Sequence, residues 1–481
     1  MQDERYVASA DLGSAKIAIS VARVEGDDIQ IVYYKETPSD GIRHSIVFNP
    51  MKASNALKTA ISEAETELNI KIKQLVMGLP RCGVHQEIRS AQLLRTDPDS
   101  CITPEEIVSL KNMALDNYPL EDIDKEDIYG AVAQSFSADD LINQSEDDIA
   151  GIVSDSIEGN FKVFIGSKKA ISNISRTANL ASVALARQYF VPDAVARAVL
   201  NNAEMDNGVA LVEIGAGVTS LTIYHGGILR HYSAIPFGGS SITADIKFEC
   251  GFKDVLAENI KLAYGSAQSE KLQNMSDKII QINDEENGTY QHLTVRYLSE
   301  IIEARAREII DAVLYTIQES GYADKLRDGV VVTGGGANLL GLSSLFKEMS
   351  GYSVRIGYPR VRSFCSSICP GAGETGAAAS IGLLLKAKED KYINCLDEKP
   401  RIAEEKEKEA ENGSEPDYTD TVFESNSGVI EPNNGKGKPK KQKHPNVFWN
   451  KLTKSVSKTA NSLFDDTVGN LYDQMGKGNN Q

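Results

Sequence analysis

Asp11-Leu12-Gly13-Ser14-Ala15-Lys16 ends the first apolar strand of the chain, and Glu213-Ile214-Gly215-Ala216-Gly217 ends a later one in the same way. In each stretch a carboxylate precedes a glycine by two residues, and a predicted hairpin of two further strands follows. The first unit runs from 6 to 34 and the second from 209 to 235. This shared order predicts an internal duplication, and two unrelated β-meanders are the alternative.

The rest of the folded region alternates between helices and buried strands. Thr103-Pro104-Glu105-Glu106 has the form of a helix start, with Thr103 as cap and Pro104 in the first turn. A short strand is predicted at 161–165. A buried strand at 330–332 ends in Thr333-Gly334-Gly335-Gly336. Longer helices are predicted at about 50–68, 170–189, 293–317 and 376–385.

Length and charge restrict the class of protein. The chain has 481 residues, too many for one hydrophobic core, so we expect two or more folding units. Its net charge of −17 argues against nucleic acid as a partner, since phosphate neutralisation needs clustered Lys and Arg. No apolar run approaches the roughly 18 residues of a membrane-spanning helix, and no signal segment precedes the first strand. The six cysteines fit no zinc spacing, and we expect them to be reduced and buried.

The paired turns suggest a grip on phosphate groups. Glycine at a strand-to-strand turn lets backbone N–H groups approach an anion closely. Lys16 is placed to neutralise a terminal phosphate, and Asp11 and Glu213 are candidate ligands of Mg²⁺ through water. An ordinary hairpin also uses such a turn, so the second copy carries the argument. Neither copy is a P-loop, and the spacing of a dinucleotide-binding site is missing.

Two further motifs are candidate nucleotide contacts. Gly334-Gly335-Gly336-Ala337-Asn338 offers bare backbone on which a flat base can pack, or it is simply a tight turn between a strand and a helix. Glu258 and Lys261 are three residues apart on a predicted helix and share one face. They are placed to reach ribose hydroxyls or a purine, and a solvated ion pair is the alternative.

Together these motifs resemble the actin–Hsp70–hexokinase superfamily and, within it, the FtsA family of bacterial cell-division proteins. The order of the motifs, more than any one of them, is what is similar. The resemblance covers roughly 5–386 plus the tail. It includes Gly13-Ser14-Ala15-Lys16, the hairpin 226–239, the helices around 257–261 and 300–305, and Val354-Arg355-Ile356-Gly357.

The resemblance implies a fold class: an α/β, two-lobed, actin-like (ribonuclease H-like, duplicated) fold with an α+β subdomain inserted in the first lobe. It also implies a division of the chain into seven parts. They are a first-lobe core at 5–82, 167–205 and 360–386; the inserted subdomain at 83–166; a second-lobe core at 206–239 and 319–359; its upper subdomain at 240–318; a linker at 387–445; an amphipathic helix at 446–466; and a tail at 467–481.

The resemblance also implies a function. ATP and Mg²⁺ would lie between the lobes, and the protein would polymerise with itself into actin-like filaments. It would tether the C-terminal peptide of FtsZ, docked on 240–318, to the cytoplasmic face of the inner membrane at the division septum. Later divisome proteins would bind through the inserted subdomain.

Two departures from the family pattern bear on catalysis. Position 213 is Glu where many relatives have Asp, and the acid or amide that orients an attacking water in hydrolytic relatives has no clear counterpart. In the corresponding stretch, 192–197, Asp193 is the only acid. We assign no catalytic residue and expect slow or absent ATP turnover.

The C-terminal region has a physical signature of its own. From about 387 to 446 apolar residues nearly vanish, as in a flexible linker. On a helix, the apolar residues that follow lie on one side and the lysines on the other, which is typical of a helix at an anionic membrane surface. Docking onto this protein or a partner is the alternative. The predicted membrane-binding residues are Phe448, Trp449, Lys451, Leu452, Lys454, Val456, Lys458 and Leu463.

Two other functions remain open at this stage. One is a phosphotransferase of the sugar-kinase branch, which needs an acid to deprotonate the acceptor hydroxyl. The other is a pilus-assembly adaptor of the PilM type, which shares the inserted subdomain but ends near the last helix of the core.

Overall fold

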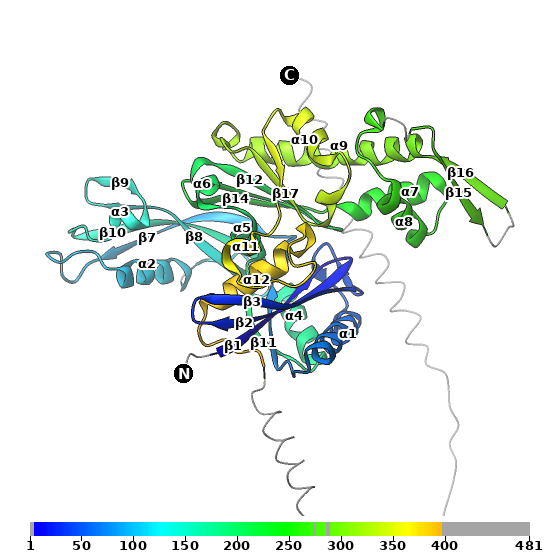
Figure 1. Ribbon diagram of the computed structural model, residues 1–481. Helices are drawn as coiled ribbons and strands as arrows, with labels where there is room; N and C mark the ends of the chain where they lie inside the picture. Colours follow the sequence, from blue (N-terminus) through cyan, green and yellow to red (C-terminus); the bar gives the residue numbers. More distant parts are fainter. Residues whose placement is uncertain (1–3, 117, 273–275, 285–288, 397–481) are drawn as a thin grey trace, which may run out of the picture. The chain divides into compact units, whose positions relative to one another are not determined.

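The computed structural model describes residues 4–396 except 117, 273–275 and 285–288. Two five-stranded sheets are built around the two predicted repeats, in the strand orders β11-β6-β1-β2-β3 and β14-β13-β12-β17-β18. In each sheet an antiparallel meander is extended by two parallel strands (Figure 1). The matching strand orders confirm the predicted duplication.

The strands of the first sheet are β1 (Glu4–Leu12), β2 (Lys16–Glu25), β3 (Asp28–Pro38), β6 (Gln74–Gly78) and β11 (Ala184–Tyr189). Those of the second are β12 (Val209–Ile214), β13 (Thr219–His225), β14 (Ile228–Ile235), β17 (Val330–Thr333) and β18 (Val354–Ile356). The turn between β13 and β14 uses Gly226 and Gly227, both at positive φ, as a two-residue hairpin requires.

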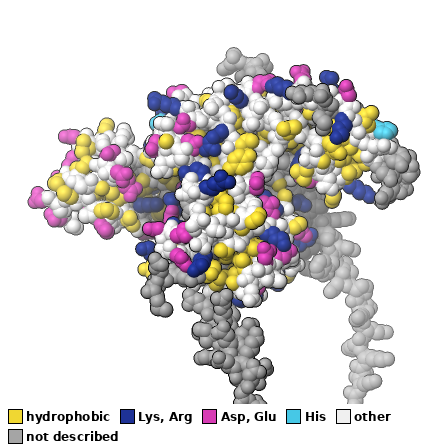
Figure 2. Space-filling view, in the orientation of Figure 1, with side chains coloured by type: hydrophobic (Ala, Val, Ile, Leu, Met, Phe, Trp, Pro, Cys, Tyr) yellow, Lys and Arg dark blue, Asp and Glu magenta, His cyan; other side chains and the backbone are white. Residues whose placement is uncertain are grey.

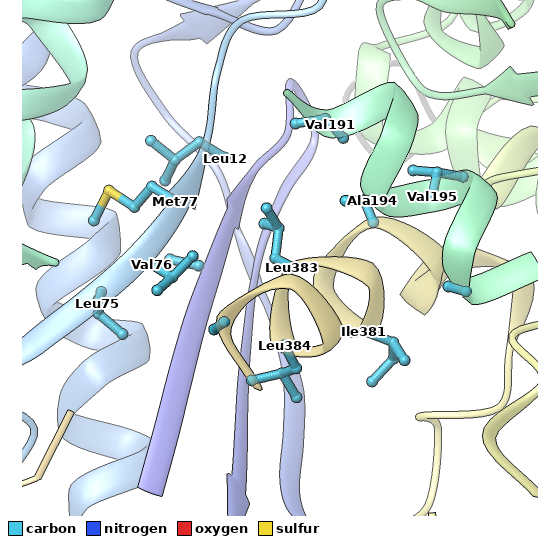
Figure 3. Close-up of a cluster of buried hydrophobic side chains, with 14 of the residues drawn as sticks. Leu12, Leu75, Val76, Met77, Val191, Ala194, Val195, Ile381, Leu383 and Leu384 are labelled. Carbon is cyan, nitrogen blue, oxygen red and sulfur yellow. The ribbon is translucent and has the colours of Figure 1, made fainter. Parts of the chain in front are cut away.

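Helices cover both faces of the first sheet. The side chain of Asn49 caps α1 (Pro50–Leu68), which packs against α4 (Lys168–Leu180). On the other face, α12 (Ala378–Glu389) packs against β1 and β2 and against α5 (Val191–Val199). Figure 3 shows Leu383 and Leu384 of α12 pointing toward this sheet. A Cβ at Gly382 would lie 2.1 Å from the carbonyl oxygen of Ala194, so the two helices approach closely only because glycine stands there.

The inserted subdomain has a separate core beneath a four-stranded sheet of order β7-β10-β8-β9. Phe136 and Phe161 meet edge to face in that core, with ring centroids 5.9 Å apart. Thr103 caps α2 through reciprocal bonds with Glu106, as predicted. The elements of the inserted subdomain are β7 (His85–Leu94), α2 (Pro104–Asp116), β8 (Glu126–Ala138), β9 (Leu141–Gln144), α3 (Glu146–Ile149) and β10 (Ser156–Ser167).

The long helix α9 (Val295–Glu319) joins the second sheet to a further helical part. Leu298 and Ile302 pack in the core of that part, whereas Ile310 and Val313 pack beneath the second sheet. The remaining elements of the part are α7 (Gly239–Cys250), α8 (Asp254–Tyr264), η1 (Ser269–Lys271), β15 (Ile279–Asp284) and β16 (Thr289–Thr294).

Short elements complete the described chain. They are β4 (Ile42–Arg43), β5 (Ile46–Val47), α6 (Asn202–Asn207), η3 (Ala323–Lys325), η4 (Gly335–Asn338), α10 (Leu342–Ser350), α11 (Val361–Phe364) and η5 (Thr375–Ala377). Within the described residues, no helix has the length and apolar character needed to cross a bilayer. The six cysteines are all free, and Cys395 is buried, but Cys101 is exposed, contrary to the expectation of burial.

Three predicted boundaries were wrong. The predicted helix at 170–189 ends at Leu180, because Ala184–Tyr189 leaves it to pair with β6 as an edge strand. The helix predicted from 293 starts at Val295, where the Thr294 side chain caps it, and residues before it belong to β16. Residues 387–396, predicted to belong to the linker, are part of the fold, since Cys395 is buried and its backbone bonds to Tyr6 and Lys73.

Candidate functional site

The two predicted phosphate turns have the same backbone geometry. The N–H of Gly13 donates to the carbonyl of Lys16 at 3.0 Å, and the N–H of Gly215 donates to that of Val218 at 2.8 Å. A Cβ would lie 2.6 Å from that carbonyl oxygen at Gly13 and 3.0 Å from it at Gly215. Each turn therefore depends on its glycine, and each lies at the end of the first strand of its repeat.

The two turns touch each other. A Cβ at Gly217 would lie 2.8 Å from the hydroxyl oxygen of Ser14 and 3.3 Å from the His44 backbone nitrogen, so the backbone of Gly217 lies close to both. The turn between β4 and β5 closes over both: the Ser45 N–H donates to Ser14 Oγ at 3.1 Å, and His44 Nδ1 lies 2.7 Å from the Gly217 carbonyl oxygen. His44 and Ser45 both have positive φ, a strained conformation for side-chain-bearing residues. Strain of this kind is typical of functional sites.

Arg81 joins the two predicted metal-binding carboxylates. Its Nη2 lies 3.1 Å from Asp11 Oδ1, and its Nε lies 3.1 Å from Glu213 Oε2. The Arg81 side chain is 9% exposed, and the Asp11 and Glu213 side chains are 13% and 12% exposed. The sequence predicts that Asp11 and Glu213 belong to one site. The structure brings them together around Arg81, a cation that was not predicted from the sequence.

The surroundings of Arg81 fix its charge and its position. Burial lowers the pKa of the guanidinium, but Asp11 and Glu213 outweigh burial, so the net pKa shift is upward and the group stays charged. The Tyr232 hydroxyl donates to the Arg81 backbone carbonyl at 2.6 Å, and Arg81 Nη1 donates to Ser45 Oγ at 3.2 Å. Arg81 thereby contacts both repeats and the strained turn.

The glycine-rich loop after β17 packs directly on the second phosphate turn. Gly334 has a φ of +86°, and a Cβ there would lie 2.5 Å from the Ile214 carbonyl oxygen. A Cβ at Gly336 would lie 2.4 Å from Ile214 Cγ2, whereas one at Gly335 would meet nothing within 4 Å. Asn338 Oδ1 accepts from the Thr375 hydroxyl at 3.1 Å, which ties the loop to η5. These predicted contacts are therefore neighbours of Gly215.

Glu258 and Lys261 also lie near that turn. Lys261 Nζ lies 2.7 Å from Glu258 Oε2 and donates to the Gly239 carbonyl at 3.0 Å. The Gly239 N–H in turn donates to the Gly215 carbonyl at 2.9 Å. The pair is a partly buried network with the Thr243 hydroxyl, and not only a solvated ion pair.

Other predicted contacts have partners within the protein. Lys16 Nζ pairs with Glu36 and borders Gly376. The carbonyl of Ala15 accepts from the Ser39 N–H at 3.0 Å, and that of Ala216 accepts from the Ser240 N–H at 2.8 Å. Whether these residues contact phosphate stays a prediction.

Asp193 lies away from the turns. It contacts Lys386 Nζ at 2.6 Å and the Tyr224 hydroxyl at 3.4 Å. Thr219 and Tyr224 lie at opposite ends of β13, about 17 Å apart along an extended strand, and Thr219 is at the end next to the second phosphate turn. Asp193 is therefore remote from the phosphate turns.

Arg81, His44 and Ser45 are the site residues that the sequence analysis missed. A signal for Arg81 did exist: it follows a buried strand that runs parallel to β1, and ligands in such sheets collect beyond the carboxyl ends of the strands. His44 and Ser45 gave no such signal, because their position depends on a turn between two very short strands. The predicted membrane-binding residues at 448–463 lie outside the described residues.

Arg81 also bears on whether Mg²⁺ fits here. Mg²⁺ takes oxygen ligands in near-octahedral geometry and keeps several of its waters. Because one guanidinium already holds Asp11 and Glu213, their carboxylates as arranged do not form a metal site. The described residues contain no group of three or more His, Cys, Asp or Glu side chains suited to a metal. A metal role for these carboxylates stays a prediction, and a metal at this place would compete with Arg81.

The fold and the paired turns define the class: an α/β, two-lobed, actin-like protein. A PilM–PilN type IV pilus biogenesis complex has a similar fold, with a TM-score of 0.57 at 15% identity over 80% of this chain and 99% of that one. The family model described as "Cell division protein FtsA" matches residues 210–376. The chain is a homologue of cell division protein FtsA.

Curated relatives extend this match well beyond 210–376. Cell division protein FtsA of Neisseria meningitidis serogroup B is 28% identical over 364 residues, which cover 75% of this chain and 85% of the relative. FtsA of Borreliella burgdorferi is 27% identical over 398 residues, covering 81% of this chain and 92% of the relative. The homology suggested by the order of the sequence motifs is thereby confirmed.

Proposed function

We propose that this chain is an ATP-binding, filament-forming adaptor that tethers FtsZ to the cytoplasmic face of the inner membrane at the division septum and recruits later divisome proteins. The observation that carries the proposal is that the two glycine turns meet at one junction, beside Arg81 and the carboxylates of Asp11 and Glu213. Homology to FtsA supplies the cell-division context.

The proposed nucleotide site consists of the two glycine turns and the glycine-rich loop that packs on the second of them. The polyphosphate binds at the turns of Gly13 and Gly215, and the base packs on the loop at 334–336. Because Ser14, His44 and Gly217 close the junction, nucleotide entry requires the turn at 44–45 to move. Mg²⁺, when bound, supplies further charge to the phosphates. Titration with a fluorescent ATP analogue tests the site, and no binding at millimolar nucleotide contradicts it.

An exposed apolar surface supports the proposed FtsZ contact. Phe248 on α7 and Val255 and Leu262 on α8 are 85%, 73% and 72% exposed. Val255 and Leu262 are two helical turns apart and share one face. Because α7 and α8 pack against each other, these exposed side chains are candidates for one protein-binding surface. We propose that the FtsZ C-terminal peptide docks on this surface, within the predicted 240–318.

Substitutions in this surface test the contact. Phe248→Ala and Leu262→Ser should each weaken binding of an FtsZ C-terminal peptide at least tenfold, about 1.4 kcal/mol. Tyr392→Ala is the control, since Tyr392 is 97% exposed and lies outside 240–318. Equal affinity of all four proteins contradicts this docking site, and absence of any binding favours another scaffold function.

The membrane tether rests on the sequence pattern at 446–466. Liposome flotation of the full chain and of a chain ending at 445 tests it. We expect the full chain to float with anionic liposomes and the shortened chain to stay in the dense fraction. Equal flotation of both contradicts the tether.

The alternative functions have less support. The PilM likeness, at 15% identity, bears on the fold alone. A sugar-kinase activity needs an acid beside the phosphate site, and Asp11 and Glu213 are both engaged by Arg81. ATP consumption that depends on an added sugar would revive that activity.

A further inference from the structure

A pocket between the inserted subdomain and the second lobe gathers positive charge. It has a volume of about 510 Å³, within the usual range of roughly 300–1,000 Å³ for small-molecule sites. Lys162 of β10, Arg230 of β14, Lys325 of η3 and His225 at the end of β13 line it, beside Gln134 and Tyr322. Among the described residues no carboxylate lines it, in a protein of net charge −17. We call it the subdomain pocket.

The cations of the subdomain pocket are held in place by neutral groups. Arg230 Nε donates to the His225 carbonyl at 3.1 Å and Nη1 donates to the Gln134 carbonyl at 2.9 Å. Lys162 Nζ donates to the Arg230 carbonyl. Lys325 Nζ lies 4.9 Å from the centroid of the Tyr322 ring. Among the described residues, none of these three cations forms an ion pair with a carboxylate, so their charges are positioned but not neutralised.

The pKa shifts agree with uncompensated positive charge. Burial, and then Arg230, lower the pKa of Lys162. Burial, and then Arg230, Lys325 and Arg327, lower the pKa of His225. Figure 2 shows Asp and Glu side chains spread over the surface of the inserted subdomain, so acids are plentiful nearby but do not line the pocket. Partly burying like charges together costs free energy, and proteins retain such arrangements mainly at functional sites.

We propose that the subdomain pocket binds a multivalent oxyanion, a small molecule carrying two or more phosphate or carboxylate groups. Three cations match two or three negative charges, and the volume exceeds what one inorganic phosphate fills. The ligand contacts the inserted subdomain through Lys162 and the second lobe through Arg230 and Lys325. Its binding therefore fixes these two parts of the protein against each other. This site is separate from the proposed nucleotide site.

The test uses pyrophosphate and citrate as probes, titrated by calorimetry into the full chain and into Lys325→Glu. Lys325 is exposed, so its replacement leaves the fold intact. We expect Lys325→Glu to lose about tenfold or more in affinity for the probe that binds. Lys347→Glu, at an exposed lysine of α10, is the matched control and keeps the wild-type affinity.

The two probes separate the sources of the anion. Binding of pyrophosphate alone assigns the pocket to phosphate-bearing ligands, and binding of citrate alone assigns it to carboxylates. ATP titration of the same variants guards against confusion with the nucleotide site, because Lys325→Glu should leave ATP affinity unchanged. Failure of both probes to bind at millimolar concentration, or equal probe affinity in wild type and Lys325→Glu, overturns the proposal.

Discussion

The Arg81 guanidinium holds both carboxylate oxygens of Glu213, with Nε 3.1 Å from Oε2 and Nη2 3.2 Å from Oε1. Arg81 follows β6 of the first sheet and Glu213 lies on β12 of the second, so this ion pair joins the two repeats. Arg81→Ala leaves Glu213 and Asp11 as close, mostly buried carboxylates without their cation. We expect it to lower the free energy of unfolding by about 3–5 kcal/mol in chemical denaturation.

Two comparisons identify the cause of that loss. Arg296→Ala breaks an exposed pair with Glu300 and should cost no more than about 1 kcal/mol. In the double variant Arg81→Met, Glu213→Gln, only Asp11 remains as an unpaired charge. This variant should therefore be more stable than Arg81→Ala. If Arg81→Ala is as stable as wild type, the guanidinium is not the link between the repeats.

Arg81 also predicts how nucleotide affinity depends on magnesium. In the wild type Arg81 already occupies Asp11 and Glu213, which leaves few carboxylate oxygens for Mg²⁺. We therefore expect chelation of Mg²⁺ to weaken ATP binding by less than about tenfold. In Arg81→Met the carboxylates are released, and we expect the Mg²⁺ dependence to become larger. Fluorescent-nucleotide titration with Mg²⁺ and with EDTA measures both. A smaller Mg²⁺ dependence in Arg81→Met than in wild type would contradict competition between the two cations.

Neighbouring glycines after β17 provide a matched pair for the proposed base-binding loop. A Cβ at Gly336 would lie 2.4 Å from Ile214 Cγ2, while one at Gly335 has open space. Gly336→Ala must therefore displace the loop from the second phosphate turn, and we expect it to weaken ATP binding about tenfold, about 1.4 kcal/mol. Gly335→Ala should bind within about twofold of wild type. The reverse order of affinities would show that the loop does not act through Ile214.

The sequence was sufficient to predict the features that depend on local chemistry. Asp11-Leu12-Gly13 and Glu213-Ile214-Gly215 carry their own signal, since each needs a glycine two residues after a carboxylate at a strand end. The cap at Thr103 and the helix start at Pro50 are equally local. These positions matched the structure because no distant part of the chain decides them.

The features that were missed depend on tertiary pairing. Ala184–Tyr189 continues an alanine-rich helical pattern in sequence, yet it becomes a strand because β6 offers it an edge. Arg81 looks like a surface arginine until the second repeat supplies Glu213. In each case the deciding partner is far away in the chain.

His231 predicts acid sensitivity of the contact between the inserted subdomain and β14. Burial, and then Lys162, lower the pKa of His231 from 6.5 to about 4. Its Nδ1 lies 2.8 Å from Gln86 Nε2, and Gln86 Oε1 accepts from the Tyr232 N–H. The Gln86 side-chain amide therefore cannot turn its oxygen toward a protonated His231 without losing the bond from Tyr232.

The sign of the effect follows from the lowered pKa. Between pH 6.5 and about 4 the unfolded chain binds a proton that the folded chain does not, so stability is full above pH 6.5 and falls as the pH drops toward 4. His231→Phe removes this proton, and its stability should fall less over that window. Denaturation of both proteins at several pH values measures the difference, and parallel curves would rule out His231 as a contributor.

Trp449 is the only tryptophan in the chain, so its fluorescence reports on the predicted amphipathic helix without labelling. If the apolar face enters the membrane interface, anionic vesicles should shift the emission to the blue, because the indole leaves water. Neutral vesicles should shift it less, since each lysine near an anionic surface contributes about 1 kcal/mol. Replacing Lys451, Lys454 and Lys458 with Gln should remove that preference while keeping the apolar face. An emission spectrum that anionic vesicles leave unchanged would instead favour docking of the helix on a protein surface.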